Sequence, residues 1–204
     1  QPPLLRIDGE VTATSFPPIS EKHLQDMLGT IVPDIHRDGF EQGVEVDFCF
    51  NITEISRFRA HIYRQYGGLA AAFRRIPLEV PSLEKQGLQD VYKSLSTLSS
   101  GLVVIAGPTG SGKSTSLYSF LSELNTTDVR IVTIEDPVEF VHQNRKSTFS
   151  HREVGLHTLG FGPALRSAIR QDADVILVGE IRDAETVDIA IRSALTGHLI
   201  LSTL

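Results

Sequence analysis

The stretch GLVVIAGPTGSGKST, residues 101–115, decides how the second half of this 204-residue chain folds. Its apolar residues Leu102 to Ala106 predict a strand, and the spacing Gly107-x-x-x-x-Gly112-Lys113-Ser114 follows directly. A strand that ends in a glycine-rich loop and turns into a helix is typical of a phosphate-binding loop, where backbone N–H groups and the helix dipole attract an anion. An ordinary glycine-rich turn with an incidental lysine is the alternative. The loop residues that we expect to bind a nucleotide are Gly107, Pro108, Thr109, Gly110, Ser111, Gly112, Lys113 (outer phosphates), Ser114 (Mg²⁺) and Thr115.

Composition narrows the class of protein. The chain is 41% hydrophobic, enough for one large domain or two small ones, and its net charge of −6 argues against a protein that coats nucleic acid. Cys49 is the one cysteine, so no intrachain disulfide forms, which suits a reducing cytoplasm. No apolar run approaches the length of a membrane span. Both ends read as lying inside strands, so we expect a longer protein.

The first half reads as an α+β unit with an antiparallel sheet. Asp8-Gly9 predicts a hairpin turn within residues 4–14, and Ser20 is a candidate N-cap for a helix that ends before Pro33. Residues 44–52 and 57–63 alternate between apolar and polar residues as strands do, and residues 70–76, after the Gly67-Gly68 turn, read as a third strand.

From Gly101 onward, strands alternate with helices, which predicts a parallel sheet covered on both faces. Pro77 and Pro81 indicate a linker, and Ser82 begins a predicted helix that runs to about Leu98, either unbroken or with a break at Gly87. The polar residues 142–155 are expected to form a surface loop. The predicted strands are 102–106, 129–134, 174–178 and 198–203, and the predicted helices are 112–124, 162–171 and 183–196.

Two acidic segments follow predicted strands. The run ADVILVGE, residues 173–180, places Glu180 where a carboxylate would lie beside the Mg²⁺ and the attacking water, although Gly179 replaces the aspartate usual in such segments. Glu135 and Glu139 follow the strand at 129–134 and could supply the missing acid. The alternative for each is a solvated strand end.

Basic residues form a third group of candidates. Arg57, Arg59, Arg64, Arg74 and Arg75 fall on two adjacent predicted strands, where they could meet an anion or form a solvated basic face. Arg57 and Arg59 share one strand face because they are two residues apart. His198 follows Thr196-Gly197 and could sense a γ-phosphate, although a lone histidine is more often structural.

The segments GPTGSGKST, TIEDPVEF, REVG, ALRSAIRQDADVILVGEIRDAET and TGHLILSTL together resemble the motor ATPases of type II and type IV secretion and of type IV pili. The resemblance covers most of residues 44–204. It implies a PAS-like α+β domain at 1–77, a linker and helix at 78–99, and a RecA-like P-loop ATPase domain at 100–204. The resemblance implies that Glu180 is the catalytic carboxylate and that Glu135 and Glu139 are supporting acids. It places His198 near the γ-phosphate, and Arg57, Arg59 and Arg74 where they reach the nucleotide. The residues that it places near the metal are Ser114, Glu135 and Glu180.

The segment from Asp47 to Leu88 resembles the retraction branch of these pilus motors, with assembly and secretion ATPases as the alternative. Two residues depart from that pattern: His151 stands where a glutamine is usual, and Arg64 lies slightly off the expected basic position. The resemblance implies ATP hydrolysis with Mg²⁺ in a homo-hexameric ring. It also implies a cytoplasmic location at the inner membrane and a pilus or secretion platform protein as partner. The negative net charge and the lack of a basic stripe with interleaved aromatics argue against nucleic acid as a partner. Because the aspartate before Glu180 is missing, a nucleotide-binding regulator without turnover stays open.

Overall fold

The computed structural model describes residues 2–204, and the chain divides into two compact units at the Arg75–Ile76 boundary. The first unit opens with the hairpin of β1 (Leu4–Ile7) and β2 (Glu10–Ala13). Asp8 and Gly9 form its turn with φ angles of 51° and 89°, the left-handed values that this turn type requires. The predicted hairpin is therefore confirmed. Ser20 caps α1 (Glu21–Gly29) by accepting from the His23 backbone N–H, as predicted.

The rest of the first unit is a sheet of three strands, β3 (Val46–Ile52), β4 (Ser56–Gln65) and β5 (Gly68–Ile76), in the order β3-β4-β5. β3 and β4 are antiparallel. A second helix, α2 (Asp34–Gln42), follows Pro33 and was not predicted separately. Leu28 of α1 and Phe40 of α2 pack on the inward side chains Phe48 and Ile62 of the sheet. The α+β prediction for this unit is confirmed.

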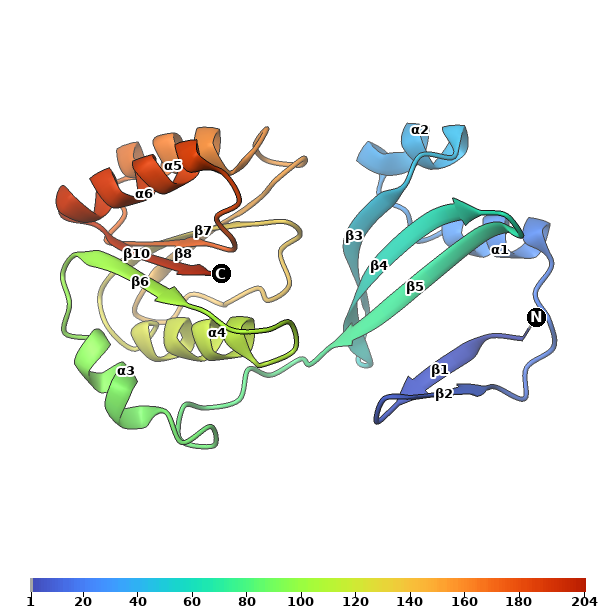
Figure 1. Ribbon diagram of the computed structural model, residues 1–204, viewed down its shortest axis with the longest axis horizontal. Helices are drawn as coiled ribbons and strands as arrows, with labels where there is room; N and C mark the ends of the chain where they lie inside the picture. Colours follow the sequence, from blue (N-terminus) through green and yellow to red (C-terminus); the bar gives the residue numbers. More distant parts are fainter. Residues whose placement is uncertain (1) are drawn as a thin grey trace. The chain divides into compact units, whose positions relative to one another are not determined.

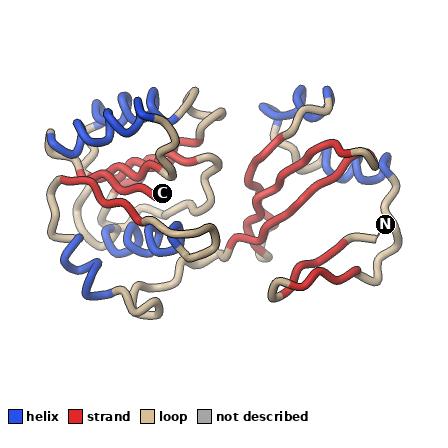
Figure 2. Tube along the Cα trace, viewed as in Figure 1, coloured by secondary structure: helices blue, strands red, loops and turns tan. Residues whose placement is uncertain are grey.

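The second unit is built on a five-stranded sheet in the order β6-β10-β9-β7-β8, and every pairing within it is parallel (Figures 1 and 2). The order places β10, the last strand in sequence, beside β6, the first. Its elements are α3 (Gln89–Leu95), β6 (Gly101–Ile105), α4 (Lys113–Leu124), β7 (Arg130–Glu135), β8 (Thr148–Glu153), α5 (Phe161–Ala168), the 3-10 turn η1 (Ile169–Gln171), β9 (Val175–Val178), α6 (Ala184–Leu195) and β10 (Leu199–Thr203).

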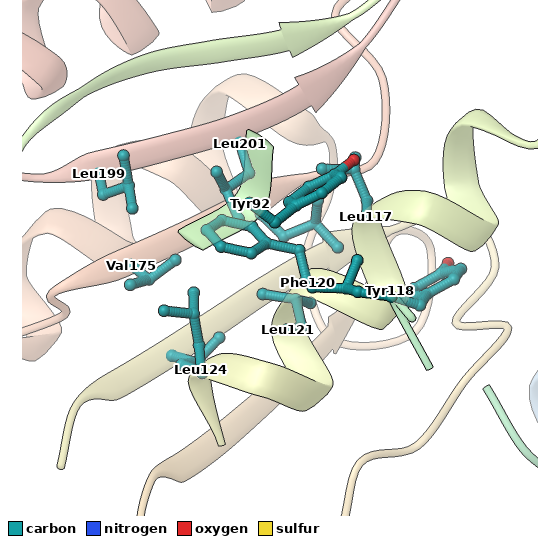
Figure 3. Close-up of a cluster of buried hydrophobic side chains, with 12 residues drawn as sticks. Tyr92, Leu117, Tyr118, Phe120, Leu121, Leu124, Val175, Leu199 and Leu201 are labelled. Carbon is teal, nitrogen blue, oxygen red and sulfur yellow. The ribbon is translucent and has the colours of Figure 1, made fainter. Parts of the chain in front are cut away.

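Helices cover both faces of this sheet, as Figure 1 shows. On one face α3 and α4 pack through side chains such as Tyr92, Phe120 and Leu121 against strand residues that include Leu199 and Leu201 (Figure 3). On the other face α5 and α6 cover the alternate residues of the same strands, among them Val132, Ile176 and Ile200. Strands buried on both faces must be apolar throughout, which is why β9 reads VILV.

Two predictions in this unit were wrong. Residues 142–155 are not all loop, because Thr148–Glu153 form β8, an edge strand paired with β7. An edge strand needs no continuous apolar run, so its polar sequence concealed it. The helix expected from Ser82 to Leu98 is restricted to Gln89–Leu95, and residues 82–88 form turns instead.

Across residues 2–204, every helix is too short or too polar to cross a membrane.

Candidate nucleotide-binding site

The carboxyl ends of four strands meet at one edge of the parallel sheet. Thr203 of β10 is level with Ile105 of β6, and Val178 of β9 is level with Ile134 of β7. The phosphate-binding loop, Glu180 and Glu135 follow β6, β9 and β7 at this edge. Loops at the carboxyl ends of the strands are where open α/β sheets bind their ligands.

The phosphate-binding loop joins β6 to α4 without a side-chain cap on the helix. Gly110 and Gly112 have φ angles of 83° and 92°, which L side chains rarely adopt, so glycine is required at both positions. Gly112 is the N-cap of α4 and supplies no side-chain hydrogen bond, so the first N–H groups of the helix are left for an anion. The Lys113 Nζ folds over the loop and donates to the carbonyls of Gly107 at 2.6 Å and Pro108 at 3.2 Å.

Ser114 and residues 107–111 of the loop are exposed, whereas Gly112, Lys113 and Thr115 are half-buried. An exposed serine beside a loop lysine fits a Mg²⁺ ion for which phosphates and water molecules supply most of the ligands. Among residues 2–204, no three His, Cys, Asp or Glu side chains gather into a self-sufficient metal site.

Glu180 lies just beyond β9 and is half-buried. One of its carboxylate oxygens pairs with Arg182 at 2.7 Å. Gly179 before it is held between neighbouring strands, because its N–H donates to the Ile134 carbonyl and its own carbonyl accepts from the Thr203 hydroxyl. A Cβ at Gly179 would lie 3.3 Å from the Ile134 carbonyl oxygen and 3.7 Å from the Glu135 side chain. Glu135 thus occupies the space beside Gly179 that a longer side chain would need.

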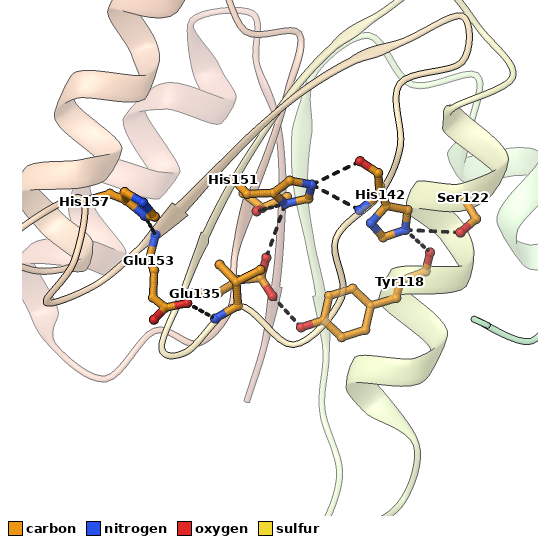
Figure 4. Close-up of polar contacts among 9 residues, drawn as sticks. Tyr118, Ser122, Glu135, His142, His151, Glu153 and His157 are labelled. Carbon is orange, nitrogen blue, oxygen red and sulfur yellow. Dashed lines mark hydrogen bonds and ion pairs between the residues drawn. The ribbon is translucent and has the colours of Figure 1, made fainter. Parts of the chain in front are cut away.

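Glu135 is only 2% exposed and lies beneath α4. Its Oε2 accepts from the Tyr118 hydroxyl at 2.5 Å, and its Oε1 lies 4.0 Å from Nδ1 of His151 (Figure 4). Burial raises the pKa of Glu135 to about 7, and the hydrogen bond from Tyr118 opposes this rise. The carboxyl group of Glu135 is therefore enclosed by protein rather than presented to the loop.

Glu139 lies four residues later, on the turn after β7, and is half-buried. Its charge contributes to the raised pKa of Glu135, so the two carboxyl groups lie near one another. Within that turn Val138 donates its backbone N–H to Oε2 of Glu153 at 2.9 Å. The structure thus brings the acidic turn, the end of β8 and Glu135 together.

His198 lies at the opposite edge of the sheet from the phosphate loop. It precedes β10, its carbonyl accepts from the Gly101 backbone N–H at the start of β6, and its Nδ1 is 3.1 Å from the Ser193 carbonyl. Five residues of strand separate this edge from the carboxyl ends, roughly 16 Å at about 3.3 Å per residue. A single chain does not bring His198 to the phosphate loop.

The candidate arginines belong to the first unit, where most already have partners. Arg59 makes two hydrogen bonds of 3.0 Å to the Asp47 carboxylate, and Arg57 donates to Asn51. Arg64 pairs with Glu21 at 3.5 Å, and Arg75 donates to Ser56. Exposed Arg74 differs, since no hydrogen bond or ion pair joins its side chain to another described residue.

Sequence reasoning missed the polar network around Glu135. Tyr118, His142 and His151 contribute to it from α4, the turn and β8, and Figure 4 shows their side chains converging. Their separation in sequence concealed the cluster. The alternating pattern in TFSHRE, residues 148–153, was the one local signal of the strand that carries His151.

A parallel five-stranded sheet with this loop and these acids defines a P-loop nucleotide-binding domain. The model of the family described as Type II/IV secretion system protein matches residues 72–204. The chain belongs to that family.

Similar proteins cover the chain to different extents. The type IV pilus retraction ATPase PilT of Pseudomonas aeruginosa is 46% identical over 204 residues, which are 100% of this chain and 59% of that protein. The crystal structure of the pilus retraction motor PilT with bound ADP matches 100% of this chain and 60% of its own, with 44% identity and a TM-score of 0.92. The type IV pilus assembly ATPase PilB of Myxococcus xanthus is 55% identical over 104 residues, 51% of this chain and 18% of that protein. The chain thus spans about 60% of the length of its retraction relatives.

Proposed function

We propose that this chain is part of an ATP-hydrolysing motor of a type IV pilus system, and that the motor powers pilus retraction. The observation that carries the proposal is the meeting of the phosphate loop, Glu180 and the acidic turn at one sheet edge. Similarity to the retraction ATPase of Pseudomonas aeruginosa over the whole chain supports the retraction role.

Each group at the edge has a distinct task in this proposal. The α4 N-terminus and Lys113 bind the phosphates, and Ser114 binds the Mg²⁺ that accompanies them. The ion, when bound, neutralises charge on the phosphate oxygens. Glu180 orients the attacking water, for which its carboxylate must loosen the ion pair with Arg182. Glu139 and Glu135 act as supporting acids. For Glu135 to bind the metal as well, its carboxylate must leave the buried hydrogen bond with the Tyr118 hydroxyl.

The remaining roles concern assembly. We propose a homo-hexameric ring at the cytoplasmic side of the inner membrane, in which the motor acts on a platform protein of the pilus. In this proposal residues 1–77 supply arginines to a nucleotide held by residues 100–204. Arg74 is the first candidate because it has no partner to leave, whereas Arg59 must separate from Asp47. His198 would act on a nucleotide of a neighbouring subunit.

Phosphate release by the purified protein tests the proposal. Wild type should release phosphate from ATP in the presence of Mg²⁺, while Glu180→Gln and Lys113→Ala should lose most of that rate and keep the fold. If wild type is no faster than both variants, the enzyme proposal fails and a non-hydrolysing nucleotide-binding regulator replaces it.

Assembly or secretion is the second candidate function, favoured by the 55% identity to the Myxococcus xanthus assembly ATPase over about half of the chain. Expression in bacteria that lack one of their own pilus ATPases distinguishes the two roles by the phenotype that is restored. In a bacterium that lacks its retraction ATPase, we expect the protein to restore twitching motility. Restored piliation in a strain that lacks its assembly ATPase, without restored twitching, would favour the second candidate.

A further inference from the structure

The turn that carries Glu139 is held at two points by side chains of β8. Val138 donates its backbone N–H to Oε2 of Glu153 at 2.9 Å, and His142 donates its backbone N–H to Nε2 of His151 at 3.2 Å. Glu139 lies between these two points. Figure 4 shows both contacts reaching from β8 to the segment, which we name the 138–142 segment.

The geometry of β8 explains why one strand supplies both acceptors. His151 and Glu153 are two residues apart and so share one face of the strand. β8 pairs in register with β7, with Thr133 opposite His151 and Glu135 opposite Glu153. Because the 138–142 segment continues from the end of β7, the register places both acceptors beside it.

His151 is itself held in one orientation. Its Nε2 accepts from the His142 backbone N–H at 3.2 Å and lies 3.4 Å from the His142 carbonyl oxygen, and its Nδ1 lies 2.9 Å from the Thr133 hydroxyl oxygen. The ring stacks on Phe149 with centroids 5.4 Å apart. The side chain is only 16% exposed, so the surrounding protein restricts its rotation.

His142 and Glu153, which also take part in these two contacts, are held by further hydrogen bonds. The His142 ring lies 3.1 Å from the Ser122 hydroxyl and 3.3 Å from the Tyr118 carbonyl, both on α4. Glu153 donates its backbone N–H to Nδ1 of His157 at 2.9 Å. The 138–142 segment is therefore joined to β8 and to the helix that begins at the phosphate loop.

We propose that His151 and Glu153 are positioning residues, which hold the 138–142 segment through its backbone N–H groups and so aim Glu139 at the reacting phosphate. The inference rests on the proposed ATPase function. Each residue supplies a hydrogen-bond acceptor, Nε2 in His151 and Oε2 in Glu153. An uncharged carbonyl oxygen on a side chain of similar length can therefore replace either acceptor.

Paired substitutions test this requirement. His151→Phe keeps the ring stack and Glu153→Ala shortens the side chain, and both remove the acceptor. His151→Gln and Glu153→Gln keep an amide oxygen in place of each acceptor. Asn144→Ala is the matched control, because Asn144 accepts the Phe149 backbone N–H at 2.9 Å and does not hold the 138–142 segment.

We expect the two acceptor-removing variants to lower kcat for ATP hydrolysis at least tenfold while KM for ATP stays within threefold. Amide hydrogen exchange should become faster at Val138 and His142, while the β9 and β10 amides keep their protection. The glutamine variants and Asn144→Ala should keep kcat within threefold of wild type.

Several results would overturn the inference. One is a glutamine variant as impaired as its acceptor-removing counterpart, since the charge or the imidazole would then be what matters. Another is an unchanged kcat in His151→Phe and Glu153→Ala with an active wild type. Loss of protection throughout the sheet would also oppose it, because that indicates general unfolding. An inactive wild type would instead contradict the proposed function itself.

Discussion

Tyr118 and Glu135 meet beneath the phosphate-loop helix, where the tyrosine hydroxyl donates to Oε2 of the carboxylate at 2.5 Å. The phenol ring packs on Phe140 with centroids 4.7 Å apart, so the helix, the acidic strand end and the following turn share this contact. Tyr118 thereby links the element that binds phosphate to the strand that leads into Glu139.

Removing the hydroxyl of Tyr118 should destabilise the fold. Tyr118→Phe keeps the ring but removes one of the hydrogen bonds to a buried carboxyl group, which costs about 1–3 kcal/mol. Urea unfolding at pH 8 should show that loss in the free energy of unfolding. Tyr66→Phe is the control, because Tyr66 is fully exposed and should change nothing. Equal stability of Tyr118→Phe and wild type would show that the contact contributes no free energy.

Glu135 should make stability fall as pH rises. Burial raises its pKa from 4.5 to about 7 in the folded state, so the folded chain holds a proton that the unfolded chain has lost between these values. The stability linked to that proton is complete below about pH 4.5 and is lost as pH rises through 7.

Glu135→Gln should remove this dependence. Between pH 5 and pH 8, wild type should lose about 3 kcal/mol of unfolding free energy relative to the variant, at about 1.4 kcal/mol for each pKa unit. Urea unfolding at both pH values measures it. A constant difference would mean that Glu135 is charged in the folded state throughout that range.

His142 should have the opposite effect at acid pH. Burial lowers its pKa from 6.5 to about 4, so the unfolded chain binds a proton that the folded chain refuses between these values. The stability linked to neutral His142 is complete above pH 6.5 and is lost as pH falls through 4.

His142→Phe tests this effect because it keeps the stack on Phe149, whose ring centroid is 4.9 Å from that of His142. Wild type should lose about 3 kcal/mol relative to the variant between pH 6.5 and pH 4. Subtracting the variant curve from the wild-type curve cancels the contribution of Glu135, which both proteins share. Parallel curves would rule out a buried neutral His142.

Gly179 should not tolerate a side chain, even though an aspartate is usual there in related ATP-binding segments. A Cβ would press on the Ile134 carbonyl oxygen at 3.3 Å, and strand backbone gives way poorly. Gly179→Ala should cost about 1–3 kcal/mol and lower Tm by about 2–4 °C for each kcal/mol.

Gly162→Ala is the matched control, because the nearest atom to its Cβ would be 3.6 Å away, an ordinary contact, within α5. It should leave Tm unchanged or raise it, since alanine favours a helix over glycine. A Gly179→Ala variant with the Tm of wild type would show that the strands separate easily at this point.

The sequence by itself determined the strand, glycine-rich loop and helix of residues 101–124, because these depend on local physical rules. Glycine at positions of positive φ, a cap at Ser20 and the apolar run of β9 are properties of a few neighbouring residues. The same reasoning identified Glu135, Glu139 and Glu180 as acids at strand ends.

Only the tertiary structure decided what those acids contact. Glu135 is buried because β8, a polar strand at the sheet edge, and Tyr118, one and a half turns into α4, both pack on it. The contact with β8 depends on which strand pairs with β7 and in what register. The contact with Tyr118 depends on how α4 packs across the sheet. Neither leaves a pattern in adjacent residues. Strand direction likewise separates His198 from the phosphate loop: β10 runs parallel to β6, so the residue that precedes β10 lies beside the start of β6, at the edge opposite the loop.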